Sequence, residues 1–434
     1  MKNPNKKFPF IINTGSAVNR TLLKNFTSLT ILQISNYLFP LITFPYLVRV
    51  LGPDKFGLVN FAAAFVGYFS IITDYGFNLS ATREVSIHRN DKKKLTEIYC
   101  SVLIIKFSLF VVSTLIIYIL VSAIPKFQIE YLTYFISFGI VFGNVLFPIW
   151  FFQGVENMKY ITILNIIFKA VATIFIFLLV TSQNDYNVLV LLNSLSFIGI
   201  GIASLIIIRV YFGIGIIFPS KNEILFQLKE GWYIFISTIA ISGYTVSNTF
   251  ILGLFTNNTV VGYFVAADKL RFILQNFLST VTKTVYPHLS KLFRESLNEG
   301  LSFVRKLLIR FGTISFIACL VIFIFAGKFV DIVLGDQYSH SIIILRIISF
   351  LPFIIVLSNI AGVQTMLNLN FKKDFAKILI ISSLINLVLS FILVPIFYEI
   401  GTSVVLLFTE FLVTSLMFIS LFRKKINLLK TEYV

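Results

Sequence analysis

Apolar and polar positions alternate in long blocks along the chain. About a dozen apolar stretches, most of them about 20 residues or longer, are separated by short polar segments. A helix of roughly 20 residues is long enough to cross the roughly 30 Å of hydrocarbon in a bilayer. The pattern therefore predicts twelve membrane-spanning helices, over residues 25–50, 57–79, 99–123, 131–154, 159–181, 187–210, 231–254, 260–287, 307–330, 341–368, 375–397 and 401–422.

Lys and Arg residues gather in every second polar segment. The two ends of the chain and the even-numbered connecting segments together hold 26 of them, whereas the odd-numbered segments hold Arg49, Lys55, Lys126 and Lys328. Short loops on the cytoplasmic side of a membrane are the ones enriched in basic residues. We therefore expect both termini in the cytoplasm, which also requires an even number of spans.

The composition agrees with an all-α, polytopic membrane protein. Mean hydropathy is +0.91, and charged residues make up 13% of the chain, about half the ~25% share in soluble domains. So little charge could not cover the surface of a soluble fold of 434 residues. The net charge of +17 would suggest a nucleic-acid partner in a soluble protein. Because the basic residues flank apolar spans here, no nucleic acid is expected.

Residues suited to catalysis or metal binding do not cluster in the sequence. The two cysteines are Cys100 and Cys319, and the three histidines, His88, His288 and His340, are scattered. No nucleophile–base pattern, metal motif or phosphate-binding loop is recognisable. No predicted external segment is long enough to carry a catalytic domain. We expect no metal and no cofactor, and we do not expect an enzyme.

The two halves of the chain resemble each other weakly. Residues 56–62 align with residues 261–267 at an offset of 205, close to half the chain. Two halves of six spans each enter the membrane from the same side, so the repeat would be parallel, with a pseudo-twofold axis along the membrane normal. The expected parts are a cytoplasmic N-terminal segment, an N-terminal lobe, a cytoplasmic linker, a C-terminal lobe and a cytoplasmic tail, over residues 1–24, 25–210, 211–230, 231–422 and 423–434.

Charged and polar residues form stripes inside the predicted span 260–287. Lys269, Asn276, Thr280 and Lys283 fall within about 40° of one another at 100° per residue. Asp268 and Arg271 form a second stripe, and their i,i+3 spacing allows them to pair. A charged group in hydrocarbon usually faces a partner or a water-filled cavity. Because Lys269 has no obvious partner in its own helix, it is the clearest candidate for a cavity cation.

Other spans carry further candidates for the cavity. Lys169 lies near mid-membrane, too deep for easy snorkelling. The alternatives are that polar stripes serve helix packing, that Lys106 and Lys283 snorkel to the cytoplasmic surface, and that Arg49 contacts outer headgroups. The candidates are the cations Lys169, Lys269, Arg271, Lys283 and Arg49, the polar groups Asn36, Asn60, Thr245 and Asn276, and the ion-coupling carboxylates Asp74 and Asp268.

Four segments carry a resemblance to a known family. They are PYLVRVLGP (45–53) followed by Phe56-Gly57, DYGF (74–77) followed by ATRE (81–84), PIWFFQGVENM (148–158), and Gly262-Tyr263 with ADKL (267–270) and PHLSK (287–291). In their order and spacing the chain resembles the Wzx-type polysaccharide flippases. That family belongs to the superfamily of multidrug extruders and the lipid II flippase. The resemblance covers nearly the whole chain.

The resemblance implies a fold, a cargo and partners. The fold would be a V-shaped pair of six-helix lobes around a central cavity in the bacterial cytoplasmic membrane. The cargo would be an O-antigen or capsule repeat unit on undecaprenyl diphosphate, moved to the outer leaflet by alternating access. A hydrophilic cavity would hold the glycan, and the cavity cations would offset the diphosphate. A polysaccharide polymerase, a chain-length regulator and membrane lipids would be the partners.

The source of energy and two rival functions remain open from the sequence. The membrane potential favours outward movement of an anion by about 2.3 kcal/mol per charge per 100 mV, and antiport of H⁺ or Na⁺ through Asp74 or Asp268 is the alternative. A cation-coupled multidrug extruder on the same fold would favour acidic cavity groups over basic ones. A glycan polymerase or ligase would need the external catalytic loop that is missing here.

Overall fold

The structure, a computed structural model, describes residues 17–245 and 247–428, with side chains described over 24–239 and 247–428. This part of the chain folds into helices and turns and contains no strand. The α-helices are α1 (Ala17–Asp74), α2 (Phe77–Ile87), α3 (Lys92–Ala123), α4 (Pro125–Gln128), α5 (Tyr131–Leu146), α6 (Ile149–Gly154), α7 (Lys159–Leu179), α8 (Tyr186–Tyr211), α9 (Lys221–Thr245), α10 (Ser247–Phe255), α11 (Asn258–Glu295), α12 (Leu297–Ile324), α13 (Ala326–Val333), α14 (Ser341–Ile348), α15 (Leu351–Asn359) and α16 (Lys372–Arg423). Three shorter segments are η1 (Gln183–Asp185), η2 (Asp336–Tyr338) and the π-helical η3 (Ile360–Met366).

Eight helical segments of the described residues are long and apolar enough to cross a membrane. Two of them, Lys24–Ile87 and Lys372–Arg423, are 64 and 52 residues long, far more than one crossing needs. The backbone leaves the helical conformation at Gly52 (φ 67°, ψ 173°) in α1 and at Tyr398 (φ 51°, ψ −125°) in α16. Both breaks fall between spans that the sequence predicts, and the count of twelve stays a prediction.

Several helices begin before the apolar stretch they contain. Helix α3 begins at Lys92, where hydropathy predicts 99, and α12 begins at Leu297, where hydropathy predicts 307. The Asp91 side chain accepts hydrogen bonds from the backbone amides of Lys93 and Lys94, both at 3.0 Å, and so caps α3. Hydropathy marks where lipid begins, whereas the capping residue decides where the helix begins. The predicted 211–230 linker is likewise helical from Lys221 onward.

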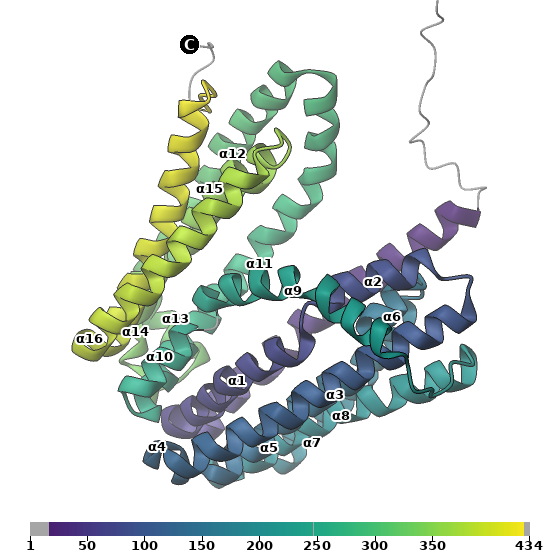
Figure 1. Ribbon diagram of the computed structural model, residues 1–434. Helices are drawn as coiled ribbons and strands as arrows, with labels where there is room; N and C mark the ends of the chain where they lie inside the picture. The colour runs from purple at the N-terminus through teal and green to yellow at the C-terminus, as the bar shows by residue number, and fades with distance from the viewer. Residues whose placement is uncertain (1–16, 246, 429–434) are drawn as a thin grey trace, which may run out of the picture.

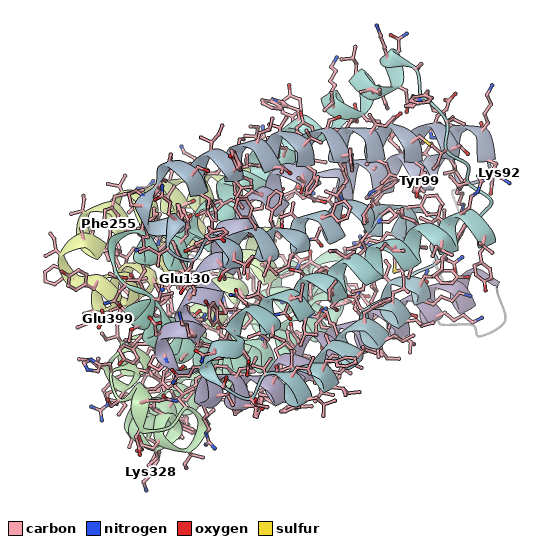
Figure 2. All side chains as sticks on the ribbon, turned by 90° about the horizontal axis from the view of Figure 1, so that it is seen from below. Lys92, Tyr99, Glu130, Phe255, Lys328 and Glu399 are labelled. Atoms are coloured by element: carbon pink, nitrogen blue, oxygen red, sulfur yellow. The ribbon has the colours of Figure 1, made fainter. Side chains whose placement is uncertain are left out.

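The helices form two groups that lie together at one end and diverge toward the other (Figure 1). We call the end near α4, α10 and α14 the converging end. Glu130, Phe255, Lys328 and Glu399 lie at this end, whereas Lys92 lies at the opposite, diverging end (Figure 2). The segments around the links between α2 and α3 and between α11 and α12, which are rich in basic residues, both lie at the diverging end (Figure 1).

Three buried apolar cores follow this arrangement. The first joins both halves of the chain and contains Phe61 and Phe127 together with Phe264 and Leu345. The second draws its buried members from residues 77–214, and the third from residues 278–428. Within the described residues, the two halves therefore share a buried apolar core near the converging end, whereas each half has its own core toward the diverging end.

Candidate functional site

A cavity of about 520 Å³ lies between the first part of α1 and α11. These two helices belong to different halves of the chain. Its lining residues are Asn36, Tyr37, Pro40, Leu41, Thr43, Phe44, Leu47, Phe56, Lys269, Phe272, Ile273, Asn276, Phe277 and Thr280. The cavity brings three of the predicted site residues together: Asn36, Lys269 and Asn276.

Lys269 is the charged residue among those that line the cavity. Its Nζ atom lies 4.9 Å from the centroid of the Phe56 ring and 5.8 Å from that of Phe44. An ammonium group at this distance is attracted to the negative face of an aromatic ring. Among the described residues, no carboxylate lies within 4.0 Å of this ammonium. Lys269 therefore rests on aromatic rings with its charge uncompensated by a direct ion pair.

Asn36 connects the cavity to a second cation. Lys169, on α7, donates a hydrogen bond from its Nζ atom to the side-chain oxygen of Asn36, at 2.7 Å. The two residues are 133 positions apart, so no sequence spacing could have indicated the pair. Lys169 is half-buried behind the cavity wall. Asn36 therefore both lines the cavity and binds the Lys169 ammonium.

Asn276 and Thr280 continue the polar stripe of α11 along the cavity. Thr280 Oγ1 donates to the backbone carbonyl of Asn276, at 2.9 Å. The 100° periodicity of α11 predicts that these two residues share a face with Lys269, and all three do line the cavity. Lys283, the fourth member of the stripe, is exposed and does not line it.

Arg271 lies on a different face of α11. It is 7% exposed, and its Nε and Nη2 atoms both contact Asp268 Oδ1 at 2.8 Å. Glu410, on α16, also interacts electrostatically with this guanidinium. The pairing expected from the i,i+3 spacing is thus present. The structure does not bring Arg271 into the cavity, and Asp268 neutralises its charge.

The remaining candidates lie outside the cavity. Arg49 is at the converging end, where its guanidinium donates to the backbone carbonyl of Ile332. Asn60 donates back to the carbonyl of Phe56 at 2.7 Å. Thr245 is the last residue of α9, and its side chain lies outside the described residues.

Asp74 pairs with a buried lysine inside the first half of the chain. Lys106 is 3% exposed, and its Nζ atom lies 3.8 Å from Asp74 Oδ1 and donates to the Asn144 carbonyl at 3.0 Å. The snorkelling alternative is therefore wrong for Lys106, because its ammonium group finds partners inside the protein. Both predicted ion-coupling carboxylates, Asp74 and Asp268, are engaged with cations.

The cavity wall is more apolar than the sequence suggested. Eight of its 14 lining residues are apolar, and five are aromatic: Tyr37, Phe44, Phe56, Phe272 and Phe277. The expectation of a hydrophilic cavity is therefore wrong for this one. The sequence did not indicate these aromatic residues, because an aromatic residue that lines a cavity and one that faces lipid look the same in an apolar span.

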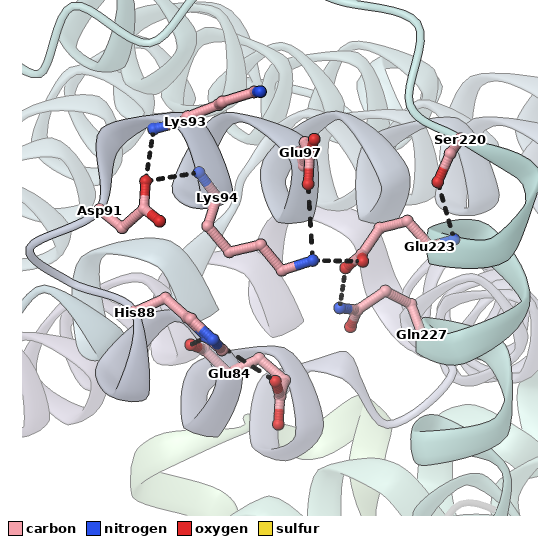
Figure 3. Close-up of polar contacts among 9 residues, drawn as sticks. All are labelled: Glu84, His88, Asp91, Lys93, Lys94, Glu97, Ser220, Glu223 and Gln227. Atoms are coloured by element: carbon pink, nitrogen blue, oxygen red, sulfur yellow. Dashed lines mark hydrogen bonds and ion pairs between the residues drawn. The ribbon is translucent and has the colours of Figure 1, made fainter.

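At the diverging end, α9 is tied to the first half by a polar network (Figure 3). Lys94 Nζ contacts Glu223 Oε2 at 2.6 Å and Glu97 Oε2 at 3.5 Å. Gln227 donates to the other oxygen of Glu223 at 2.9 Å. Arg83 and Glu230 form a further, more exposed pair at 3.6 Å. The start of α9 therefore packs with α2 and α3.

This network predicts a measurable loss of stability. Lys94→Gln removes the charge that faces the buried Glu223, and a hydrogen bond to a charged group contributes about 1.5–3 kcal/mol. We expect the apparent melting temperature in detergent to fall by several degrees. The matched control is Lys93→Gln, because the Lys93 side chain points away from the network (Figure 3). Equal melting temperatures for both variants would contradict the role given to Lys94.

Comparison with known proteins agrees with the motifs of the sequence. Residues 22–293 match the model of a family described as "Polysaccharide biosynthesis protein". The chain belongs to this family. It is 36% identical over 397 residues to a protein of Escherichia coli (strain K12) named "Putative O-antigen transporter", covering 92% of this chain and 96% of the relative. A Shigella dysenteriae protein of the same name is 31% identical, over 91% of this chain and 98% of the relative.

Solved structures share the fold at low sequence identity. The lipid II flippase MurJ in an inward closed conformation superposes with a TM-score of 0.71 at 13% identity, covering 92% of this chain and 87% of that one. An inward-facing multidrug transporter of the MATE family gives 0.64 at 13% identity, covering 91% and 97%. The predicted resemblance to Wzx-type flippases is confirmed, and the chain is classed with transporters rather than with enzymes.

Proposed function

We propose that this protein moves a lipid-linked oligosaccharide, a short glycan on undecaprenyl diphosphate, from the cytoplasmic to the outer leaflet of the bacterial cytoplasmic membrane. The observation that carries the proposal is the cavity between α1 and α11, in which Lys269 has no ion-pair partner among the residues that the structure describes. The relatives named as O-antigen transporters point to the same class of cargo.

The chemistry of the cavity suits an amphipathic anion. A cation–π contact contributes about 0.5–2 kcal/mol, whereas a charge-assisted hydrogen bond to phosphate is stronger. A diphosphate entering the cavity would therefore draw the Lys269 ammonium away from Phe44 and Phe56. The apolar and aromatic wall would contact the first isoprene units and the sugar faces, whose hydroxyl groups cannot enter hydrocarbon alone.

The same proposal includes the topology. Two lobes of six spans, residues 25–210 and 231–422, would be joined by the cytoplasmic linker 211–230, with residues 1–24 and 423–434 also in the cytoplasm. The basic segments around the links between α2 and α3 and between α11 and α12 lie at the diverging end, and basic loops face the cytoplasm. The conformation described here would therefore open toward the cytoplasm, and alternating access would require the converging end to open.

The membrane potential is the simplest driving force in this proposal. Two negative charges crossing the whole field would gain roughly 4–5 kcal/mol at 100 mV. Antiport of H⁺ or Na⁺ is the alternative. It would require Asp74 to separate from Lys106, or Asp268 to separate from Arg271, before the carboxylate could bind the ion. A polysaccharide polymerase and a chain-length regulator would use the exported unit.

Transport by the purified protein tests the proposal. The chain is reconstituted in liposomes that contain an undecaprenyl diphosphate-linked glycan, and an impermeant glycosidase reports which glycans are exposed outside. We expect the glycans of the inner leaflet, which the glycosidase cannot reach, to become accessible to it faster than in protein-free liposomes. If the protein leaves that rate unchanged but transports a cationic dye, the flippase proposal fails and the multidrug extruder replaces it.

A further inference from the structure

Two helix ends meet at the converging end, and each is capped by the other half of the chain. The first part of α1 ends at the Gly52 break, and the carbonyls of Val48 and Arg49 accept hydrogen bonds from Gln337 Nε2 at 3.3 and 3.2 Å. Helix α10 ends at Phe255. The carbonyls of Gly253 and Leu254 in its last turn, and that of Thr256 directly after it, accept hydrogen bonds from Lys126 Nζ.

The two caps are related by the internal repeat. Adding the offset of 205 to positions 48 and 49 gives 253 and 254, so the accepting carbonyls are at equivalent positions. The donors come from comparable but not equivalent places in the fold. Lys126 lies in α4, directly after the long helix α3, whereas Gln337 lies in η2, which follows the long helix α12 and the short helix α13. Each half therefore caps the end of the first predicted span of the other half, the first part of α1 in one case and α10 in the other.

A backbone contact lies between these caps. A Cβ atom on Gly57 would be 1.8 Å from the Asn258 carbonyl oxygen, and one on Gly262 would be 1.9 Å from that of Pro53. Asp54 and Thr259, also 205 positions apart, are joined by a hydrogen bond of 3.4 Å. These reciprocal contacts place the pseudo-twofold axis here. Only glycine allows the two backbones to approach so closely.

The caps differ in charge. The last carbonyls of a helix lack partners within the helix and carry a partial negative charge. The Lys126 ammonium donates hydrogen bonds to these carbonyls and also offsets their partial negative charge, whereas the Gln337 amide donates hydrogen bonds but carries no charge. Partial burial lowers the pKa of the Lys126 ammonium from its ordinary value, because desolvation disfavours the charged form. The carbonyls around it offset part of that cost.

We infer that Lys126 and Gln337, each of which caps a helix of the other half of the chain, hold the converging end closed, and that Lys126 is the stronger cap. Opening this end would separate both donors from their carbonyls and expose the Gly57–Gly262 contact to water. The inference rests on the proposed alternating access for its role in transport. The caps themselves are a property of the conformation and need no cargo.

Distance measurements between the two halves test the inference. Nitroxide labels are placed at Gln128→Cys in α4 and Lys328→Cys in α13, which are both exposed, in the full-length reconstituted chain with Cys100 and Cys319 replaced by alanine. Double electron–electron resonance then gives the populations of short and long distances. We expect Lys126→Gln to raise the ratio of long to short distances about tenfold, and Gln337→Ala to raise it less.

Lys55→Gln is the matched control. Lys55 is also a basic residue of the converging end, but it pairs with Glu130 of its own half, at 2.8 Å. We expect it to leave the distance populations unchanged. The inference is overturned if Lys126→Gln leaves them at the parent values, or if Lys55→Gln shifts them equally. Because the readout is a distance, it is independent of whether the glycan transport assay succeeds.

Discussion

Lys269→Met is expected to lower export of the polysaccharide unit by about tenfold or more. The ammonium is the cavity cation that has no ion-pair partner among the described residues, and removal of one charge-assisted hydrogen bond to a phosphate in an apolar site has at least this effect. Methionine keeps a side chain of similar length against Phe44 and Phe56. The measurement is the amount of surface polysaccharide in cells that lack their own exporter, normalised to the variant protein in the membrane.

Two further variants make this prediction specific. Lys269→Arg keeps the positive charge and should retain most of the export. Lys283→Met removes a charge from the same helical stripe but outside the cavity, so it should stay near the parent level. Export at the parent level by Lys269→Met, or an equal loss for Lys283→Met, would contradict the role of the cavity cation.

Asp74→Asn is expected to destabilise the protein by about 3 kcal/mol. The substitution leaves the Lys106 ammonium buried beside a neutral group, with the Asn144 carbonyl as its remaining partner, and breaking one member of a buried ion pair has a cost of this order. Unfolding of the purified protein by titration with sodium dodecyl sulfate measures the change.

The double variant Asp74→Asn/Lys106→Met separates a structural role of this pair from ion coupling. The double variant should regain most of the lost stability, because it no longer buries an unpaired charge. If Asp74 serves structure alone, the double variant also recovers export. Recovered stability with export still lost would instead assign Asp74 to coupling. A single variant as stable as the parent would contradict the account of the ion pair.

The sequence predicts the features of this protein that repeat along a helix. Hydropathy places the apolar helices, and the 100° periodicity places Lys269, Asn276 and Thr280 on one face of α11, where all three line the cavity. The same reasoning foresees the Asp268–Arg271 pair, because its partners lie one turn apart. Such features depend on local geometry alone.

Features that join distant parts of the chain were beyond the sequence. The Lys169–Asn36 hydrogen bond and the Lys126 cap on α10 each join residues more than 100 positions apart. Arg271 and Lys269 are two residues apart and both carry a positive charge, yet Arg271 is ion-paired and buried while Lys269 lines the cavity. The i,i+3 spacing indicates which charge is paired, but only the packing of α11 against α1 places Lys269 in a cavity.

Binding of the cargo lipid tests the central claim most directly. Native mass spectrometry of the purified protein with an undecaprenyl diphosphate-linked glycan measures the bound fraction for the parent chain, Lys269→Met and Lys283→Met. The account predicts that Lys269→Met weakens binding about tenfold, while Lys283→Met binds as the parent does. Equal binding by the parent and Lys269→Met would contradict the claim that this cavity lysine holds the anionic cargo.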